Sequence, residues 1–380
     1  MKILNINSSL DPISGGGTAE RTMQMSRYLS IEKNLVSILT LDLGITSEVR
    51  NKLAGINLIA IPCINKRFLV PSITNNKISE SIHKADVIHL MSHWTIINLI
   101  AYFWIRKYKK PYVVCPAGAL PIFGRSKILK KFYNFFGGNS YIKNANINIA
   151  ISHDEFEHFY KYKVVKKNIL LIPNGIEPKS YKFNNNNYIR KKFLLGDNPF
   201  LLFVGRLNYI KGPDLLLEAF SKIEKKYPKY SLIFAGPDNG MKDNLILESE
   251  KIGISNKVKF IGYVGSELKS MLYHAADLLV IPSRSEAMSI VVLESAITAT
   301  PVLMTNSCGL EEMTGDNGAI SVNPDVTSIT EGLLKILQKD SDLTLRGKKL
   351  KKYVESKFTW NHIVKEYIKM YENILSKSIK

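Results

Sequence analysis

The sequence predicts an α/β protein made of two doubly wound domains that face each other across a cleft. Short apolar runs alternate with helical segments of about 10–15 residues, which is typical of βαβ units around a parallel sheet. The alternation stops at the polar, Asn-rich stretch 178–190 and then restarts. The length of 380 residues also suits two domains, at about 100–200 residues for each.

The first series occupies residues 1–177. Its predicted strands are short apolar runs bounded by turn residues, at 2–8, 36–42, 56–62, 86–92, 111–117, 146–152 and 168–175. The clearest helices between them are at 20–30, 95–110 and 154–162. Because ligands of such sheets bind beyond the carboxyl ends of the strands, the cleft between the domains is the expected site.

The second series follows the predicted linker at 178–190 and occupies residues 191–357. Its predicted strands are at 200–206, 230–236, 258–264, 277–283, 300–306 and 318–323. Its first three predicted helices are at 212–227, 242–253 and 266–276, and further predicted helices continue to the end of the sequence. No repeat of fixed period interrupts either series, so a solenoid is not predicted.

Composition places the chain among soluble globular proteins, with 45% hydrophobic and 22% charged residues. No signal peptide and no apolar run long enough to span a membrane is recognisable. Cys63, Cys115 and Cys308 are scattered and odd in number, which argues against a disulfide framework or a zinc site. These features predict a cytoplasmic protein without a metal or a cofactor.

The formal net charge of +19 is spread unevenly. Residues 1–175 contain 23 Lys and Arg against 10 Asp and Glu, and the rest contain 29 against 23. Such an excess suits nucleic acid, an anionic membrane surface or a phosphorylated substrate. A simple compositional bias toward Lys is the alternative, although the concentration in the first half favours an anionic partner there.

A candidate diphosphate clamp follows the strand at 200–206. Gly205 permits close approach of the backbone, Arg206 offers a planar fork suited to phosphate, and Lys211 adds a mobile charge. The helix that starts beyond Lys211 adds its own attraction for anions. The alternative is a solvated turn that carries two surface cations.

Two carboxylates stand out in the apolar stretch SRSEAMSIVVLESAITATPV, which runs from Ser283 to Val302. Glu286 is predicted at a loop tip, and Glu294 about one turn into the following helix. Backbone amides of Met288, Ser289 and Ile290 would be free at the helix start to hold a phosphate. Carboxylates accept hydrogen bonds, so they suit sugar or ribose hydroxyls. The alternative is a capping acid with a paired, buried glutamate.

In the first half, Gly15, Gly16 and Gly17 lie between the first strand and the first helix, where backbone can approach a phosphate or sugar closely. The run is not the spaced G-x-G-x-x-G fingerprint, and only Asp42 stands near the end of the second strand. A dinucleotide site, and with it a dehydrogenase, is therefore poorly supported. A flexible turn is the alternative.

DVIHLMSHWT places His89 and His93 at the carboxyl end of a strand, where they would face the cleft. A histidine there can orient a sugar or steady developing charge. The pair has no third ligand for a metal, and two structural histidines are the alternative.

Residues 121–143 interleave aromatic and basic side chains. On a helix this pattern gives an apolar side and a basic side, which suits an anionic lipid surface. Basic and aromatic interleaving also suits RNA, and an ordinary packed helix is the third possibility. The residues concerned are Phe123, Phe132, Tyr133, Phe135 and Phe136 with Arg125, Lys127, Lys130 and Lys131.

Taken in order, FVGRL with KG, LIFAGP, VKFIGYV and the glutamate pair before TPV resemble the donor-binding half of retaining family 4 GT-B glycosyltransferases. IPNGI at 172–176 is similar to the junction between the Rossmann-like domains of that family. The segment 358–380 is similar to its final helix, which crosses back to the first domain. HLMSHW and KPYVVCPAGAL resemble the acceptor half of members that build surface polysaccharides.

The resemblance implies a role for each candidate residue. Arg206 and Lys211 would bind the donor diphosphate, and the Gly16–Gly17 loop would close over it. Glu294 would hold the ribose, and Glu286 the donor sugar together with Met288, Ser289 and Ile290. Gly262, Tyr263 and Val264 would lie beside the base. His93, His89 and Glu286 would serve at the reaction centre, with no metal required.

Three departures from the family pattern concern the sugar pocket. Met91 stands where relatives often have the reaction-centre histidine, with His93 two residues further on. Ala287–Ser289 replaces Gly-Phe-Gly after the first glutamate. Thr298–Thr300 replaces Cys-Gly before Pro-Val.

The resulting hypothesis is a cytoplasmic, membrane-associating retaining glycosyltransferase. It would move a sugar from a UDP- or GDP-linked donor to a glycan, lipid-linked, for O-antigen, capsule or exopolysaccharide. The alternatives are a non-catalytic nucleotide-sugar-binding regulator and an RNA-binding protein, although no nucleic acid is the expected partner. Loss of the reaction-centre histidine would favour the regulator, and salt-dependent RNA affinity would favour the second.

Overall fold

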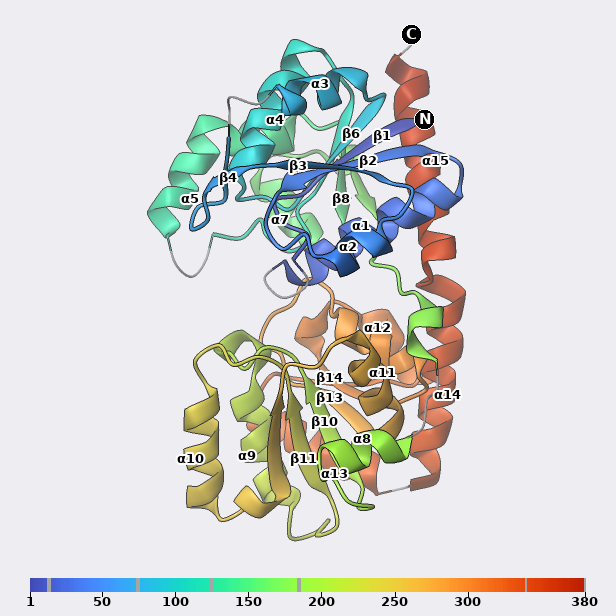
Figure 1. Ribbon diagram of the computed structural model, residues 1–380. Helices are drawn as coiled ribbons and strands as arrows, with labels where there is room; N and C mark the ends of the chain where they lie inside the picture. Colours follow the sequence, from blue (N-terminus) through green and yellow to red (C-terminus); the bar gives the residue numbers. More distant parts are fainter. Residues whose placement is uncertain (12–14, 73–75, 123–125, 183–185, 339, 379–380) are drawn as a thin grey trace. The chain divides into compact units, whose positions relative to one another are not determined.

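The computed structural model describes residues 1–11, 15–72, 76–122, 126–182, 186–338 and 340–378 (Figure 1). Contacts divide the chain into two units. The first comprises Met1–Gly175 with Trp360–Lys380, and the second comprises Ile176–Thr359. Each unit has a parallel sheet with its own buried core, as the alternating pattern predicts.

The described part of the first unit contains a parallel sheet in the order β3-β2-β1-β6-β7-β8-β9. The strands are β1 (Lys2–Ile6), β2 (Leu35–Leu41), β3 (Asn57–Ile61), β6 (Val87–Met91), β7 (Tyr112–Cys115), β8 (Ile147–Ala150) and β9 (Ile169–Leu171). A small antiparallel pair, β4 (Cys63–Asn65) and β5 (Val70–Pro71), lies apart from it.

Apart from α15 (Trp360–Ser378), which follows the second unit in the chain, the helices of the first unit connect these strands. They are α1 (Gly16–Ile31), α2 (Ser47–Lys52), α3 (Lys77–Lys84), α4 (Ile96–Lys107), α5 (Lys127–Tyr133), the π-helix η1 (Asn134–Gly138), α6 (Asn139–Lys143), α7 (Glu155–Lys161), η2 (Lys166–Asn168) and α15 (Trp360–Ser378). Since all strands of the sheet run parallel, such crossovers are required between them.

In the second unit, the described sheet has the order β12-β11-β10-β13-β14-β15. Its strands are β10 (Phe200–Val204), β11 (Ser231–Ala235), β12 (Val258–Gly262), β13 (Leu278–Ile281), β14 (Val302–Thr305) and β15 (Ile320–Val322). Every side chain of β10 and β13 is buried, as expected for central strands covered on both faces.

The helices of the second unit include short 3₁₀ turns at several strand ends. They are η3 (Pro178–Tyr181), α8 (Asn186–Lys192), η4 (Tyr209–Lys211), α9 (Pro213–Ile223), α10 (Lys242–Ile252), η5 (Ser255–Lys257), α11 (Ser266–Ala275), α12 (Ile290–Ile297), η6 (Asn306–Cys308), η7 (Glu311–Met313), η8 (Gly315–Asn317), α13 (Val326–Leu337) and α14 (Asp340–Lys357). The stretch 178–190, predicted as a linker, thus contains η3 and most of α8, which contact α11 within this unit.

Both sheets have a topological switch point. Strand order reverses between β1 and β6 in the first sheet and between β10 and β13 in the second. At such a point the two adjacent connections leave in opposite directions, and a crevice opens at the carboxyl ends of the strands. A ligand site in the second unit is therefore expected at the loops after β10 and β13.

The final helix, α15, packs on α1 in the first unit, where Figure 1 shows it in red. Trp360 is buried and stacks on Tyr28 with ring centroids 6.4 Å apart. Tyr367 accepts a hydrogen bond from the buried guanidinium of Arg21. Three separate buried contacts, counting the one between Tyr371 and His89, thus attach this helix to the first sheet and to α1.

Candidate active site

Glycines line the carboxyl edge of the second sheet next to the switch point. Gly205 follows β10, Gly236 follows β11 and Gly262 ends β12. Gly236 has φ +149°, and a Cβ there would lie 1.9 Å from the carbonyl oxygen of Gly205. Its N–H donates to the carbonyl of Gly262 at 2.7 Å. Only glycine fits at position 236, so the backbones that follow β10 and β11 pack closely together at this edge.

The predicted base-proximal residues follow directly from β12. Gly262 has φ +73°, a conformation that favours glycine. Tyr263 is 54% exposed, whereas Val264 is buried. An exposed aromatic ring at this edge is available to stack on a planar group.

Lys211 and Glu286 meet at the switch point. Lys211 Nζ lies 2.8 Å from Glu286 Oε2, and the Ser283 hydroxyl donates to the other oxygen of Glu286. The lysine comes from the turn after β10 and the glutamate from the loop after β13. The structure thus brings together two residues that the sequence predicts for one site, 75 positions apart in the chain. Arg206 is exposed and follows Gly205 in the turn after β10.

Arg284 and Asp214 hold these two loops together. Arg284 donates to both oxygens of Asp214, at 2.9 and 2.6 Å, and to the carbonyl of Tyr209 at 2.7 Å. The neighbouring Gly212 has φ +65°, and a Cβ there would lie 2.1 Å from the carbonyl of Pro282. A bidentate fork of this kind is specific in geometry as well as favourable in energy. It fixes the turn that carries Lys211 against the loop that carries Glu286.

The Arg284–Asp214 pair was not predicted from the sequence. Arg284 stands next to the predicted glutamate loop, and Asp214 lies in the first turn of α9. Their neighbours were recognised for chemistry, but the pairing depends on the distance between two loops. A sequence alone contains no signal for that distance.

The start of α12 differs from the prediction. The N–H of Ser289 donates to the carbonyl of Cys308 at 3.0 Å, so this amide is not free for a phosphate. The N–H of Glu286 likewise donates to Ser307 at 2.9 Å. The loop after β14 occupies these donors because Gly309, at φ +65°, lets it pack tightly against Ala287. The prediction of a free amide is therefore wrong for Ser289.

The Ser289 side chain is available instead. Its hydroxyl is buried and has no hydrogen-bond partner among the described residues. It stands as the N-cap of α12 without making a capping bond. Met288 before it is buried, and Ile290 is the first residue of the helix. An unsatisfied buried hydroxyl at a helix N-terminus is a donor that a bound anion would satisfy.

Glu294 is engaged by three donors. Its Oε1 accepts from Tyr181 at 2.8 Å and from Lys269 at 2.6 Å, and its Oε2 accepts from Tyr273 at 2.6 Å. Burial, with the charge of Glu294 beside it, raises the pKa of Tyr273, which therefore remains a donor. The structure therefore shows the alternative reading of Glu294, a paired and buried glutamate. Ribose binding at Glu294 stays a prediction.

The predicted glycine loop of the first unit is partly helical. Gly16 and Gly17 belong to the first turn of α1, and the N–H of Gly15 donates to Asp11 at 2.9 Å. A Cβ at Gly16 would meet no atom within 4 Å, although its φ of +54° favours glycine. These glycines follow β1 at the carboxyl edge of the first sheet, and their proposed closure over a donor stays a prediction.

His93 does not face open space. Its side chain is 0% exposed, with Nε2 at 3.1 Å from Asn134 Oδ1 and Nδ1 bonded to the Tyr141 hydroxyl. Tyr133 and Trp94 pack around the ring. Both ring nitrogens are thus used inside the fold, and the prediction that His93 faces a cleft is wrong.

His89 is also 0% exposed, within β6 rather than beyond its end. Its Nδ1 lies 2.8 Å from the hydroxyl of Tyr371, and its Nε2 has no partner among the described residues. The expectation of a cleft-facing imidazole fails here as well, because a mid-strand position in a sheet covered on both faces is interior. For both histidines the structural alternative describes what is observed.

These two neutral histidines are expected to make the protein less stable in acid. Burial lowers the pKa of His93 to about 3, and burial together with Arg21 lowers that of His89 well below its ordinary value. The unfolded chain, titrating at about 6.5, then binds more protons than the folded chain below that pH. The free energy of unfolding should be flat above it and fall by about 1.4 kcal/mol per pH unit for each histidine below it.

Urea unfolding at pH 7, 6 and 5 measures this dependence. The variant His93→Asn keeps a hydrogen-bonding side chain and should show a shallower loss of stability between pH 7 and 5. A free energy of unfolding that does not change between pH 7 and 5 would contradict the assignment of both rings as neutral and buried.

The segment predicted to be basic and aromatic is largely exposed. Phe123 and Arg125 lie outside the described residues. In α5 and η1 the large apolar side chains that are more than half exposed are Ile128, Leu129, Phe132, Phe135 and Phe136. Tyr133 faces inward and donates to the carbonyl of Thr95 at 3.0 Å. An ordinary helix packed on the core stays an alternative, because Tyr133 of α5 packs against that core, although α5 has no fully buried residue.

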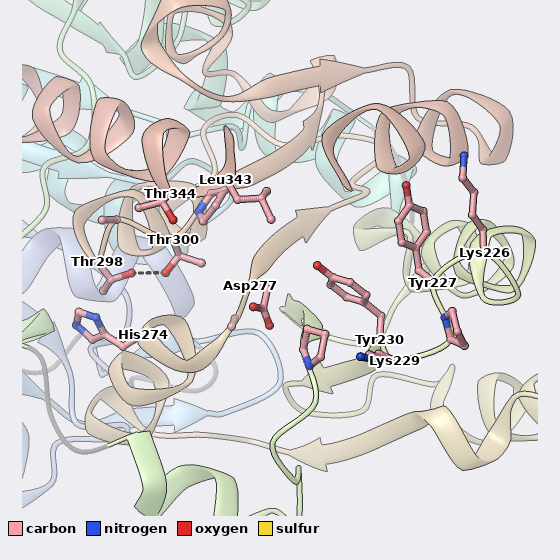
Figure 2. Close-up of a pocket in the computed structure, with 15 residues that line it drawn as sticks. Lys226, Tyr227, Lys229, Tyr230, His274, Asp277, Thr298, Thr300, Leu343 and Thr344 are labelled. Atoms are coloured by element: carbon pink, nitrogen blue, oxygen red, sulfur yellow. Dashed lines mark hydrogen bonds between the residues drawn. The ribbon is translucent and has the colours of Figure 1, made fainter. Parts of the chain in front are cut away.

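A separate pocket lies at the opposite edge of the second sheet (Figure 2). Its volume is about 700 Å³, and its lining includes Pro199, Tyr230 and Pro301, which precede β10, β11 and β14. Tyr227 and Lys226 form one side, and Thr298 and Thr300 the other, where they bond each other at 2.8 Å. None of the residues predicted to bind the donor borders it, so it is not the site described above. Thr298–Thr300 do border it, so the prediction that this departure from the family pattern concerns the sugar pocket is wrong.

Comparison with known families places both halves of the chain. Residues 15–180 match the family model "Glycosyltransferase Family 4", and residues 184–357 match "Glycosyl transferases group 1". The chain belongs to the group 1, family 4 glycosyltransferases. The resemblance seen in the motifs is confirmed on this point, and so is the GT-B fold.

Relatives of this glycosyltransferase carry the names of different activities, among them D-inositol 3-phosphate glycosyltransferase and glycogen synthase. An uncharacterized glycosyltransferase of Methanocaldococcus jannaschii is 34% identical over 216 residues, 54% of each chain. The D-inositol 3-phosphate glycosyltransferase of Corynebacterium urealyticum is 29% identical over 180 residues, 45% of this chain and 42% of its own. The chain thus spans about half the length of the curated relatives that it matches.

Solved structures with the same fold cover the whole glycosyltransferase. HepE from Anabaena, in complex with UDP and glucose, aligns with a TM-score of 0.78 at 17% identity, over 98% of this chain and 100% of its own. WaaG, described as involved in lipopolysaccharide biosynthesis, aligns with a TM-score of 0.69 at 20% identity, over 96% and 98%. At these identities the likeness shows the fold.

No group of three or more His, Cys, Asp and Glu side chains is placed to hold a metal ion in the part of the chain that the structure describes. Among the same residues, no helix is long and apolar enough to cross a membrane.

Proposed function

We propose that this family 4 glycosyltransferase transfers a sugar, with retention of configuration and without a metal, from a nucleoside diphosphate sugar to a glycan acceptor. One observation carries the proposal. Lys211 and Glu286, a cation and a hydroxyl acceptor, lie 2.8 Å apart at the switch point of the second sheet. This is the place where doubly wound sheets bind nucleotides.

Without a ligand, the two charges neutralise each other. A bound donor would present a diphosphate to Lys211 and sugar hydroxyls to Glu286, and so would replace one ion pair by two interactions of matching sign. Glu286 accepts hydrogen bonds from the sugar because its carboxylate has free lone pairs once Lys211 turns to the phosphate. The Arg284–Asp214 fork keeps both loops in position during this exchange.

Departure of the diphosphate develops negative charge at the bond that breaks. Lys211 and Arg206 would stabilise that charge, and the Ser289 hydroxyl at the start of α12 would donate to it. Preorganised donors in a site that excludes water lower the barrier most, because they need no reorganisation during the reaction. In this proposal Gly262, Tyr263 and Val264 border the base, and Met288 and Ile290 border the sugar.

The acceptor is proposed to be a growing surface polysaccharide, lipid-linked. The complex of HepE with UDP and glucose supports a UDP-linked donor, and the involvement of WaaG in lipopolysaccharide biosynthesis supports a polysaccharide product. The acceptor-half motifs HLMSHW and KPYVVCPAGAL support the same class. No observation favours RNA as the partner. The excess of positive charge is explained by binding to the donor diphosphate and to an anionic membrane surface.

Thermal shift against a panel of UDP-, GDP-, ADP- and CDP-sugars tests the donor class. At least one member should raise the melting temperature, by linkage between binding and folding. The product formed from that donor should keep the anomeric configuration of the sugar, as read by NMR. Absence of any shift across the panel would contradict a nucleotide-sugar donor, and an inverted product would contradict retention.

A non-catalytic nucleotide-sugar-binding regulator is the second candidate, because both predicted reaction-centre histidines are buried. The same thermal-shift panel would give a positive result for it. Release of the free sugar or of a transferred product from the stabilising donor separates the two candidates. Binding without any turnover on a glycan acceptor would favour the regulator.

We propose that the first unit binds an anionic membrane surface through α5 and η1. The exposed apolar side chains of this segment are long enough to enter the headgroup region, and Lys127, Lys130 and Lys131 supply charge for anionic lipid. The segment is fixed from its inner side, since Tyr133 and Asn134 bond the core. Isolated surface apolar residues need no explanation, but five in nine positions do.

Vesicle sedimentation tests the membrane proposal. The double variant Phe135→Ser, Phe136→Ser should bind vesicles of phosphatidylglycerol and phosphatidylcholine about tenfold more weakly, because burial of two aromatic side chains is lost. Charge reversal at Lys127, Lys130 and Lys131 should weaken binding only to vesicles that contain phosphatidylglycerol. Leu247→Ser, at an apolar residue of α10 that is 62% exposed, is the control. Unchanged sedimentation of both variants would exclude this surface.

A further inference from the structure

A lysine that the family resemblance did not indicate lies at the glutamate proposed to hold the ribose. Lys269 Nζ is 2.6 Å from Glu294 Oε1, and the pair connects α11 with α12. Lys269 is one turn into α11, whose N-terminus directly follows the predicted base-proximal residues 262–264. A cation thus stands between the expected place of the base and the carboxylate.

The hydrogen-bonding capacity of Glu294 limits how a ribose can bind. A carboxylate has about four lone-pair positions, two on each oxygen. Tyr181 and Lys269 use both positions of Oε1, and Tyr273 uses one of Oε2. One position therefore remains on Oε2, which is enough for one ribose hydroxyl. Two vicinal hydroxyls need a second partner.

Burial indicates from which side a ligand reaches this group. Among the three donors, Tyr273 is 0% exposed and Tyr181 is half-buried and tied to η3. The Lys269 side chain is 22% exposed, whereas that of Glu294 is only 6% exposed. A ligand that reaches Glu294 from solvent therefore passes Lys269 or Tyr181, and of these two Lys269 lies in the helix that follows the base-proximal residues 262–264.

We propose that Lys269 is a specificity-determining residue that recognises the ribose of the donor together with Glu294. One ribose hydroxyl donates to Glu294 Oε2, and the vicinal hydroxyl oxygen accepts a hydrogen bond from Lys269. An ammonium has three donors, and Glu294 uses one of them, so two remain for the ligand. The inference rests on the proposed function, since it assumes a nucleotide at this edge.

The arrangement predicts discrimination by the sugar of the nucleotide. A ribonucleotide satisfies the remaining position of Glu294 and a remaining donor of Lys269, whereas a 2′,3′-dideoxy nucleotide covers both and leaves them without a partner. Sites built to bond a hydroxyl reject analogues that lack it, because the unpaired groups keep their desolvation cost. We expect binding to fall by about tenfold or more between the two ligands.

Calorimetric titration of Lys269→Met tests the inference, with the nucleoside diphosphate of the base that stabilises the protein best and its 2′,3′-dideoxy form. The variant should bind the ribonucleotide about tenfold more weakly and the dideoxy form nearly unchanged, so the ratio of the two affinities shrinks. Lys269→Gln, which keeps donors without the charge, should give an intermediate ratio and serves if the methionine variant does not fold.

Lys257→Met is the matched control, because Lys257 pairs with Glu224 at similar exposures of 22% and 18% but precedes β12, at the other end of that strand. This control should leave the ratio of affinities unchanged. An equal loss for both ligands in Lys269→Met, or no loss for either, would overturn the ribose assignment. If the unchanged protein binds no nucleoside diphosphate of any base, the proposed function fails, and that result is distinct from an unaltered ratio.

Discussion

Replacing Lys211 with alanine is expected to lower turnover of the donor about a hundredfold to a thousandfold. The side chain supplies the charge nearest to the proposed diphosphate, and loss of one preorganised donor to a developing negative charge has an effect of about this size. Turnover is measured as release of nucleoside diphosphate from the donor that gives the largest thermal shift. Arg206→Ala should act in the same direction, by less, because Arg206 is exposed.

Two comparisons separate chemistry from stability. Lys222→Ala removes a surface lysine whose partner, Glu218, lies 3.3 Å away on the same helix, and it should leave turnover unchanged. Glu286→Gln, combined with Lys211→Ala, should cost less than the sum of the single variants, since the two side chains are in contact. Equal turnover in Lys211→Ala and the unchanged protein would contradict the proposal that Lys211 binds the donor diphosphate.

Trp360→Ala is expected to lower the free energy of unfolding by about 3–5 kcal/mol. The indole is buried at the start of α15 and stacks on Tyr28 of α1. A Cβ at Gly175 would lie 2.6 Å from its ring, so the surrounding backbone is close-packed and the cavity has little room to collapse. Urea unfolding followed by circular dichroism measures the change.

The control for this variant is Phe136→Ala, an aromatic residue that is 72% exposed in η1. It should change the free energy of unfolding by about 0.5 kcal/mol or less. A small change for Trp360→Ala would mean that α15 is not part of the cooperative core of the first unit. The contacts of Tyr367 with Arg21 and of Tyr371 with His89 would then need a different explanation.

The strands of both sheets were predictable, because buried parallel strands are continuous apolar runs bounded by turns. The runs predicted at 200–206 and 277–283 contain β10 and β13. Arg206 and Glu286 lie in the loops that follow these two strands. The approach of Lys211 to Glu286 also follows from topology, since connections from adjacent strands meet at the switch point. Local pattern and topology together determine that much.

Other parts of the site depend on packing that no local pattern contains. The amide of Ser289 is not free because it donates to the carbonyl of Cys308, in the loop after β14. Glu294 accepts hydrogen bonds from Tyr181 of η3 and Lys269 of α11, two elements outside its own helix. The predicted orientation of His93 failed for a similar reason, because Asn134, 41 positions along the chain, closes over it. In each case the deciding partner is distant in sequence.

The central claim is that the carboxyl edge of the second sheet binds the diphosphate of a nucleotide sugar through Lys211. Calorimetric titration of the unchanged protein and of Lys211→Ala with a nucleoside diphosphate and with its monophosphate tests the claim most directly. The unchanged protein should prefer the diphosphate by about tenfold or more, and Lys211→Ala should lose that preference while still binding the monophosphate. Equal affinity of the unchanged protein for both ligands, or a preference that survives in Lys211→Ala, would contradict it.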